Sequence, residues 1–307
     1  MIISASRRTD IPSFYSKWFI NRLNEGYLLI PNPYNTNRIS RVNLSPENVD
    51  CIVFWTKNQL PMMKSLDHID HLGYKYYFQY TLNPYDSDVE RNLPDISRRI
   101  DTFIKLSQKT SPKQIIWRYD PIFIDEQHTV NWHIKEFSRL CKKLSGHTER
   151  CFISFIDLYR NMQSRYNSVS IENMLILGAE FSKIANESKI DIYTCSETID
   201  LTEYGIKNGA CIDKLLIEEI IDCKIEAKID SNQRINCNCI ESIDIGAYNT
   251  CFNDCDYCYA NSSKKLLNSQ KHSYDWKSPM ISGYPRGDEI INDRTQESSK
   301  IDQIMMF

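Results

Sequence analysis

The stretch Cys51-Ile-Val-Phe-Trp-Thr-Lys-Asn58 decides the fold class, because six residues suited to a buried strand lead directly into two polar ones. Short runs of apolar, β-branched and aromatic residues are typical of strands covered on both faces. Similar runs recur along the chain. We predict seven buried strands, at residues 2–6, 51–56, 76–82, 114–119, 151–156, 190–195 and 242–245.

Helix-forming stretches separate these runs. Residues 13–25 follow Pro12 and end at Gly26, which match the start and stop signals of a helix. Residues 171–188 keep apolar side chains at helical spacing. This alternation favours parallel strands with crossover helices, in a doubly wound α/β sheet or a complete or partial (β/α) barrel, and we favour the barrel.

Length and composition suggest one large domain. A chain of 307 residues suits one barrel, which we place at residues 1–262, with a short irregular tail or lid at 263–307. No stretch approaches the roughly eighteen apolar residues of a membrane span. The first residues show no basic leader followed by an apolar core. We therefore expect a cytoplasmic protein without a membrane partner.

Charge and motifs exclude several function classes. The net charge of -3 gives no global attraction to phosphate backbones, so nucleic acid is a partner only if a local basic patch exists. The histidines show no HExxH spacing, which argues against a hydrolytic metalloenzyme. The sequence contains neither a GxGxxG nor a GxxxxGK[ST] motif, so dinucleotide and P-loop nucleotide binding are not indicated.

Polar side chains stand at or just after the carboxyl ends of the predicted strands, which meet on one face of a barrel. We predict that six of them shape the catalytic pocket: Arg7, Arg8, Lys57, Gln79, Arg118 and Asp120. The alternative for each is a helix cap or a loop contact. Arg7 and Arg8 could hold a carboxylate or phosphate, or form ion pairs with Asp10 or Asp120.

The last predicted strand runs into a loop with cysteines spaced C-x3-C-x2-C, at Cys251, Cys255 and Cys258. Three neighbouring thiolates can hold three corners of a [4Fe–4S] cluster and leave the fourth iron open to another ligand. Structural zinc normally takes four protein ligands from two separated pairs, so zinc fits this motif less well. We expect Tyr257 to pack beside the cluster.

This loop resembles the signature of the radical S-adenosylmethionine superfamily. The resemblance implies that S-adenosylmethionine binds the open iron and that a donor such as flavodoxin or ferredoxin supplies electrons. In most of that superfamily the motif follows the first barrel strand, whereas here it comes last. We predict a circularly permuted barrel, in which strand 242–245 lies beside strand 2–6.

Nearly the whole chain resembles a family catalogued as domain of unknown function 1848. The resemblance rests on the stretches 4–12, 53–58, 76–82, 117–121, 154–159 and 244–251. It implies a cysteine cluster of the radical type and no particular substrate.

A second cysteine group consists of Cys195, Cys211, Cys237 and Cys239, which could meet near the barrel mouth. Four thiolates would saturate a second [4Fe–4S] cluster or a zinc ion, and we slightly favour iron–sulfur because C-x-C is not a typical zinc spacing. The alternative is that these are small buried side chains and loop thiols. The other four cysteines, Cys51, Cys141, Cys151 and Cys223, have no partner at metal spacing.

The sequence thus predicts an enzyme that uses a [4Fe–4S] cluster and S-adenosylmethionine to generate a 5′-deoxyadenosyl radical, which abstracts hydrogen from an unknown substrate. One alternative is a radical lyase or repair activity on nucleic acid. The other is a non-enzymatic iron–sulfur or zinc protein.

Overall fold

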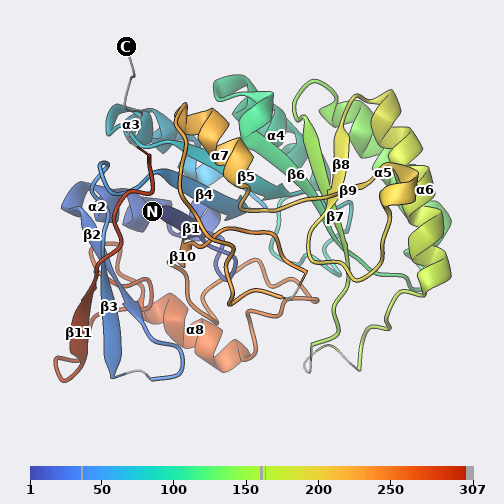
Figure 1. Ribbon diagram of the computed structural model, residues 1–307. Helices are drawn as coiled ribbons and strands as arrows, with labels where there is room; N and C mark the ends of the chain where they lie inside the picture. Colours follow the sequence, from blue (N-terminus) through green and yellow to red (C-terminus); the bar gives the residue numbers. More distant parts are fainter. Residues whose placement is uncertain (36, 160–161, 163, 235, 302–307) are drawn as a thin grey trace, which may run out of the picture.

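The computed structural model describes residues 1–35, 37–159, 162, 164–234 and 236–301. Within these ranges, the main feature is a sheet of eight parallel strands (Figure 1). In spatial order they are β10 (Ile243–Asp244), β1 (Ile2–Ala5), β4 (Cys51–Thr56), β5 (Tyr76–Thr81), β6 (Ile115–Ile122), β7 (Arg150–Phe155), β8 (Asp191–Thr194) and β9 (Lys207–Asn208). All seven predicted strands belong to this sheet; the two-residue β9 was not predicted.

Alternate residues of the strands face two separate apolar clusters. On β4, Ile52 and Phe54 point into one cluster, while Cys51 and Val53 point into the other. Both faces of the sheet are therefore covered, which explains why the strands read as continuous apolar runs. The α/β class predicted from the sequence is confirmed.

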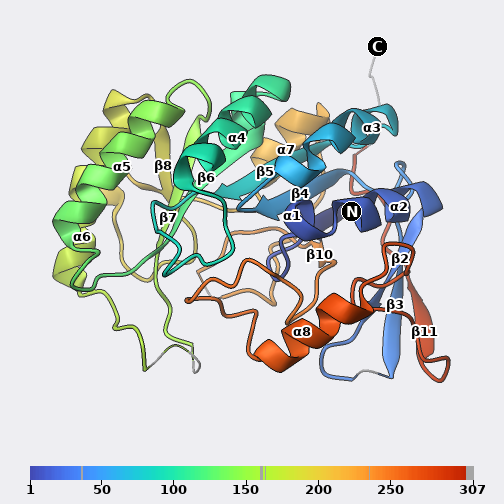
Figure 2. The ribbon, with the colours of Figure 1, turned by 180° about the vertical axis from the view of Figure 1, so that it is seen from behind.

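Most helices cover the first of these faces. They are α1 (Ile11–Phe14), α2 (Ser16–Glu25), α3 (Leu66–His71), α4 (Ile96–Lys109), α5 (Val130–Leu144) and α6 (Ile171–Glu187). α7 (Lys214–Ile221) packs on the other face, and the two opposite views show it across the sheet from α4 (Figures 1 and 2). The predicted helix at 13–25 is broken at Tyr15 but ends at Gly26, whose φ of 74° is the left-handed conformation that glycine favours.

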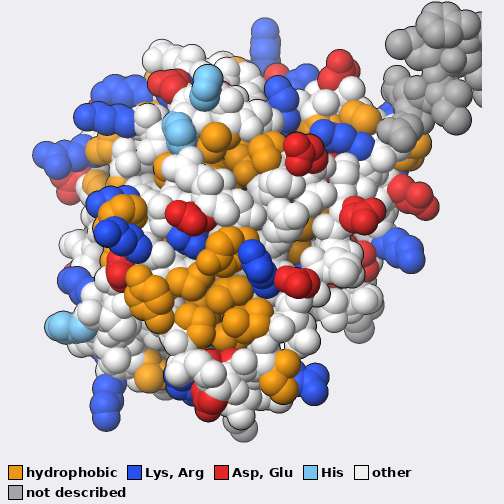
Figure 3. Space-filling model, turned by 90° about the vertical axis from the view of Figure 1, so that its left-hand side faces the viewer, with side chains coloured by type: hydrophobic (Ala, Val, Ile, Leu, Met, Phe, Trp, Pro, Cys, Tyr) orange, Lys and Arg blue, Asp and Glu red, His pale blue; other side chains and the backbone are white. Residues whose placement is uncertain are grey.

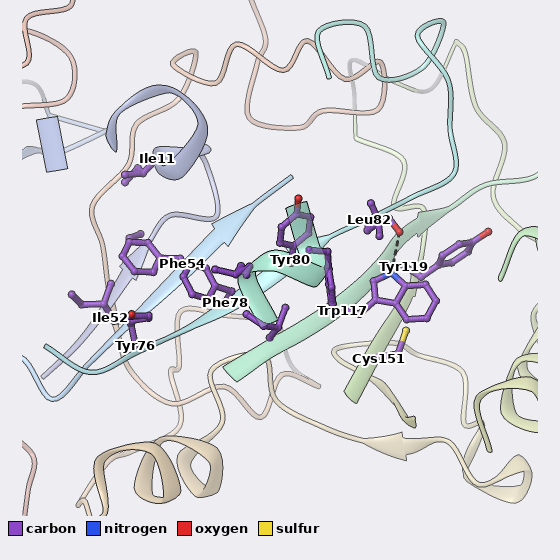
Figure 4. Close-up of a cluster of buried hydrophobic side chains, with 14 of the residues drawn as sticks. Ile11, Ile52, Phe54, Tyr76, Phe78, Tyr80, Leu82, Trp117, Tyr119 and Cys151 are labelled. Carbon is purple, nitrogen blue, oxygen red and sulfur yellow. Dashed lines mark hydrogen bonds between the residues drawn. The ribbon is translucent and has the colours of Figure 1, made fainter. Parts of the chain in front are cut away.

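The core between the sheet and the outer helices is rich in aromatic rings (Figure 4). Phe54 and Phe78 stack across neighbouring strands with ring centroids 5.2 Å apart. Trp117 packs against Phe137 of α5 at 5.1 Å, and its Nε1 donates to the carbonyl oxygen of Leu82 at 3.0 Å. Burying each such side chain contributes about 1.5–3 kcal/mol, so this core fixes the strands whose ends form the site.

The order of the sheet places the last strand beside the first. Ile243 and Asp244 of β10 pair in parallel with Ile3 and Ser4 of β1, as the permuted arrangement predicts. β10 and β9 are the two edges, and no pairing between them closes a complete barrel in the described part of the chain.

The prediction of an irregular tail is wrong. The segment after residue 262 contains α8 (Lys264–Ser273) and β11 (Ile290–Arg294). β11 pairs with β3 (Arg38–Asn43), which pairs with β2 (Tyr27–Pro31), in a second small sheet. α8 buries only Leu267 and β11 is exposed throughout, so neither carries the apolar periodicity that predicts an element. The division at residue 262 stays a prediction.

The small sheet forms one side of the molecule, where Figure 3 shows apolar side chains gathered among charged ones. Ile290 and Ile291 of β11 are exposed on this side. Among the described residues, no helix has the length and apolar character needed to span a membrane.

Candidate active site

A cavity of about 700 Å³ opens at the carboxyl ends of the parallel strands. Five of the six predicted pocket residues line it: Arg7, Arg8, Lys57, Arg118 and Asp120. Tyr257 and all seven predicted metal-binding cysteines line it too. The sixth predicted residue, Gln79, does not; it is buried, and its Nε2 donates to the carbonyl oxygen of Cys211 at 2.7 Å.

The loop after β10 is held in shape by its own hydrogen bonds. Asn249 has a φ of 58°, and its Oδ1 accepts from the backbone N–H groups of Ser262 and Ser263 at 2.8 and 3.0 Å. Asn261 Nδ2 donates to the carbonyl oxygen of Cys251 at 2.6 Å. The two ends of the cysteine loop are therefore fastened together, and its thiols face the cavity.

The thiols of Cys251, Cys255 and Cys258 are partly buried, and burial raises the pKa of each, to about 12 for Cys251. The three sulfur atoms do not all lie within 4.8 Å of one another. In a cluster, each of three such thiolates would bind a different iron.

A buried polar network lies behind this loop. Lys57 Nζ is 2.9 Å from Glu90 Oε1 and donates to the hydroxyl oxygen of Tyr257 at 2.7 Å. Tyr257 in turn donates to Glu90. Arg99 Nη1 pairs with the other Glu90 oxygen at 2.7 Å. Although burial opposes it, the charges of Lys57 and Arg99 hold the pKa of Glu90 below its ordinary value.

Asp10 is a second buried anchor of the loop. Its carboxylate accepts from Thr56 Oγ1 and the Lys57 backbone N–H at 2.8 Å and from Asn253 Nδ2 at 2.9 Å. It also caps α1 through the N–H of Ser13. Asp10 therefore joins the start of α1, the end of β4 and the cysteine loop, and its carboxylate serves as a helix cap.

The alternative considered for Arg7 and Arg8, an ion pair with Asp10 or Asp120, is not found among the described residues. Arg8 pairs with Asp244 of β10 at 3.0 Å, not with Asp10 or Asp120. Asp244 also accepts from Ser6 Oγ and from the Arg7 N–H. The Arg7 guanidinium lies over the Trp55 ring at 5.0 Å. Among the described residues Arg7 forms no ion pair, whereas the other cations of the cavity do.

Arg118 and Asp120 form an ion pair with each other, at the end of β6. Arg118 Nη1 also donates to the Cys211 sulfur at 2.8 Å, and its guanidinium lies 5.3 Å from the Trp55 ring. Arg118 therefore links the cavity wall to the second cysteine group.

Three of the four cysteines of the second group lie close together. Cys195 follows β8, Cys211 follows β9, and Cys237 and Cys239 precede β10. The sulfurs of Cys195, Cys211 and Cys239 lie within 4.8 Å of one another and could hold a metal ion. The Cys237 thiol also interacts with those of Cys195 and Cys239. The other cysteines are separate: Cys51, Cys141 and Cys151 are fully buried, and Cys223 is partly exposed.

Sequence reasoning did not single out the residues that complete these networks. Asn83, Glu90 and Arg99 belong to loop or helix stretches without a chemical motif, so only the fold reveals them. Asp244 could have been found, because the predicted pairing of strand 242–245 with strand 2–6 brings it beside Arg8. Glu197 lies just after β8; its carboxylate accepts from Ser154 Oγ at 2.7 Å, and burial raises its pKa to about 7.

Comparison with curated proteins finds no match. A family model does match, over residues 2–260, and so covers the large sheet, the cavity and both cysteine groups. This chain therefore belongs to the family described as Domain of unknown function (DUF1848).

Proposed function

We propose that this protein is a radical S-adenosylmethionine enzyme, in which Cys251, Cys255 and Cys258 hold a [4Fe–4S] cluster. When bound and reduced, the cluster would supply one electron to S-adenosylmethionine and so break its C5′–S bond, giving methionine and a 5′-deoxyadenosyl radical. This radical would take a hydrogen atom from an unknown substrate and become 5′-deoxyadenosine. The electron comes from a donor such as flavodoxin or ferredoxin.

One observation carries the proposal: three cysteines of a single loop line the same cavity as the charged ends of β1, β4 and β6. The residues fit the group, because three thiols of one loop line the cavity and three thiolates can hold three corners of a cubane while the fourth iron stays open. A cavity of about 700 Å³ is within the range that binds a cofactor of this size.

The chain's own residues bind and orient the ligands in this proposal. Arg7 is the cation of the cavity without a carboxylate partner among the described residues, so we assign it to the carboxylate of S-adenosylmethionine. The Lys57–Glu90–Tyr257 network holds the cysteine loop against β4 and β5. The pairing of β10 with β1 supports a partial, circularly permuted barrel as the scaffold.

The alternatives have weaker support. An activity on nucleic acid needs unpaired cations to hold phosphates, yet Arg8, Lys57 and Arg118 are each paired with a carboxylate. A purely metal-binding protein needs no cavity beside its cysteines.

The test is anaerobic reconstitution with iron and sulfide, followed by reduction with dithionite. The electron paramagnetic resonance spectrum should change on adding S-adenosylmethionine, and 5′-deoxyadenosine should form. Cys255→Ala should abolish both, whereas the control Cys223→Ala, outside the cavity, should retain them. A cluster that does not respond to S-adenosylmethionine would rule the enzyme out.

A further inference from the structure

The four cysteines of the second group come from the two opposite edges of the sheet. Cys211 follows the edge strand β9, Cys195 follows its neighbour β8, and Cys239 precedes β10 at the other edge. The backbone confirms the approach, since Ile240 N–H donates to the carbonyl oxygen of Ile212 at 3.1 Å. The thiols therefore meet where strand pairing leaves the sheet open.

The spacing of the sulfurs indicates how many metal ions they share. The Cys195 and Cys239 sulfurs are 4.0 Å apart, and Cys211 lies within 4.8 Å of both. Four thiolates at a zinc–sulfur distance of about 2.3 Å around one tetrahedral ion lie about 3.8 Å apart. In a cubane, each thiolate extends outward from a separate iron, so the sulfurs stand farther apart. The spacing of these three sulfurs fits a single ion. The Cys237 sulfur lies outside this group, but its thiol interacts with those of Cys195 and Cys239, so Cys237 is the candidate for the fourth ligand.

The surroundings suit metal-bound thiolates. Arg118 Nη1 donates to the Cys211 sulfur at 2.8 Å, and Ile212 N–H donates to the Cys239 sulfur at 3.3 Å. Arg7 also interacts electrostatically with Cys211, Cys237 and Cys239. Four thiolates and a divalent ion carry a charge of about −2, so guanidinium and backbone N–H groups directed at the sulfurs favour the bound form.

The backbone that carries Cys211 is fixed from the sheet. Tyr77 Oη and Gln79 Nε2 both donate to the Cys211 carbonyl oxygen at 2.7 Å. Cys211, Cys237 and Cys239 are buried, while Cys195 is partly buried. Such preorganisation places the ligands without relying on a flexible loop.

We propose that Cys195, Cys211, Cys237 and Cys239 bind one zinc ion, which joins the two edges of the sheet. With four protein ligands the ion has no open position, so it is structural and takes no substrate. This reverses the slight preference for a second iron–sulfur cluster, because sulfur spacing in three dimensions is more informative than the C-x-C spacing in sequence. The inference does not depend on the proposed function.

The first test uses the wild-type protein, grown with both metals and purified anaerobically. Reconstituted protein should contain about one zinc and about four irons per chain. Zinc X-ray absorption should show four sulfur neighbours at about 2.3 Å. A count of about eight irons without zinc, or oxygen and nitrogen neighbours around zinc, would overturn the proposal.

Variants separate the two cysteine groups. Cys195→Ala, at the least buried ligand, should lose the zinc and retain the iron, and Cys255→Ala should do the opposite. Cys223→Ala is the matched control and should keep both metals. Zinc retained at full occupancy in both Cys195→Ala and Cys237→Ala would overturn the assignment. Because zinc is measured directly, a failed radical assay leaves this result intact.

Discussion

Lys57 Nζ donates to the hydroxyl of Tyr257 at 2.7 Å, so the residue that follows β4 is bonded to the aromatic residue just before Cys258. Both side chains also contact Glu90, which is 1% exposed. The cysteine loop thus rests on a buried carboxylate that two cations neutralise.

Glu90→Gln should destabilise the protein by about 3–5 kcal/mol, because it leaves Lys57 and Arg99 buried without a counter-charge. Urea unfolding of the protein without metal measures the loss. Glu219→Gln removes an exposed ion pair with Lys113 and should cost less than about 1 kcal/mol. Equal losses in the two variants would contradict the role given to Glu90.

Gly246→Ala should disturb the site by overpacking. A Cβ at this position would overlap the side chains of Ser6 and Thr9, next to the Arg8–Asp244 ion pair. We expect a loss of about 1–3 kcal/mol in unfolding free energy, measured by denaturant titration. In the control Gly178→Ala, the new methyl meets the ends of two side chains, Leu201 at 3.0 Å and Ile206 at 3.6 Å, and stability should change by less than about 1 kcal/mol.

Glu197 should make stability fall as pH rises. Its pKa is raised to about 7 in the folded protein from 4.5, so between these values the folded state binds more protons than the unfolded state. The folded state therefore loses stability from about pH 4.5 to pH 7, on the order of 2 kcal/mol. Glu197→Gln should flatten this part of the profile, whereas the exposed Glu187→Gln should leave it unchanged. An identical slope in wild type and Glu197→Gln would refute this.

Arg7→Gln should weaken S-adenosylmethionine binding about tenfold or more, because a charge-assisted hydrogen bond contributes about 1.5–3 kcal/mol. Calorimetric titration of the reconstituted protein with S-adenosylmethionine measures the dissociation constant. Arg286→Gln is the control, since Arg286 lies outside the cavity. Unchanged affinity in Arg7→Gln would remove Arg7 from the binding site.

The sequence predicted the seven central strands because burial on both faces makes them apolar throughout. It missed β3 and β11, whose exposed residues interrupt any apolar pattern, and β9, which has only two residues. It also missed β2, although residues 27–31 form an apolar run without an exposed residue. The loop of Cys251, Cys255 and Cys258 was recognisable from its C-x3-C-x2-C spacing. The partners of Arg8 and Lys57 were not, since Asp244 and Glu90 reach them only through tertiary contacts.

The adjacency of β10 and β1 also constrains the order in which the protein can mature. β1 is synthesised well before β10. The edge of β1 that pairs with β10 therefore stays without this partner until β10 has left the ribosome. Asp244, which organises Arg8 and the end of β1, emerges just before the three cysteines of its loop. The cavity at the strand ends can therefore be completed only after β10 has been synthesised and has paired with β1.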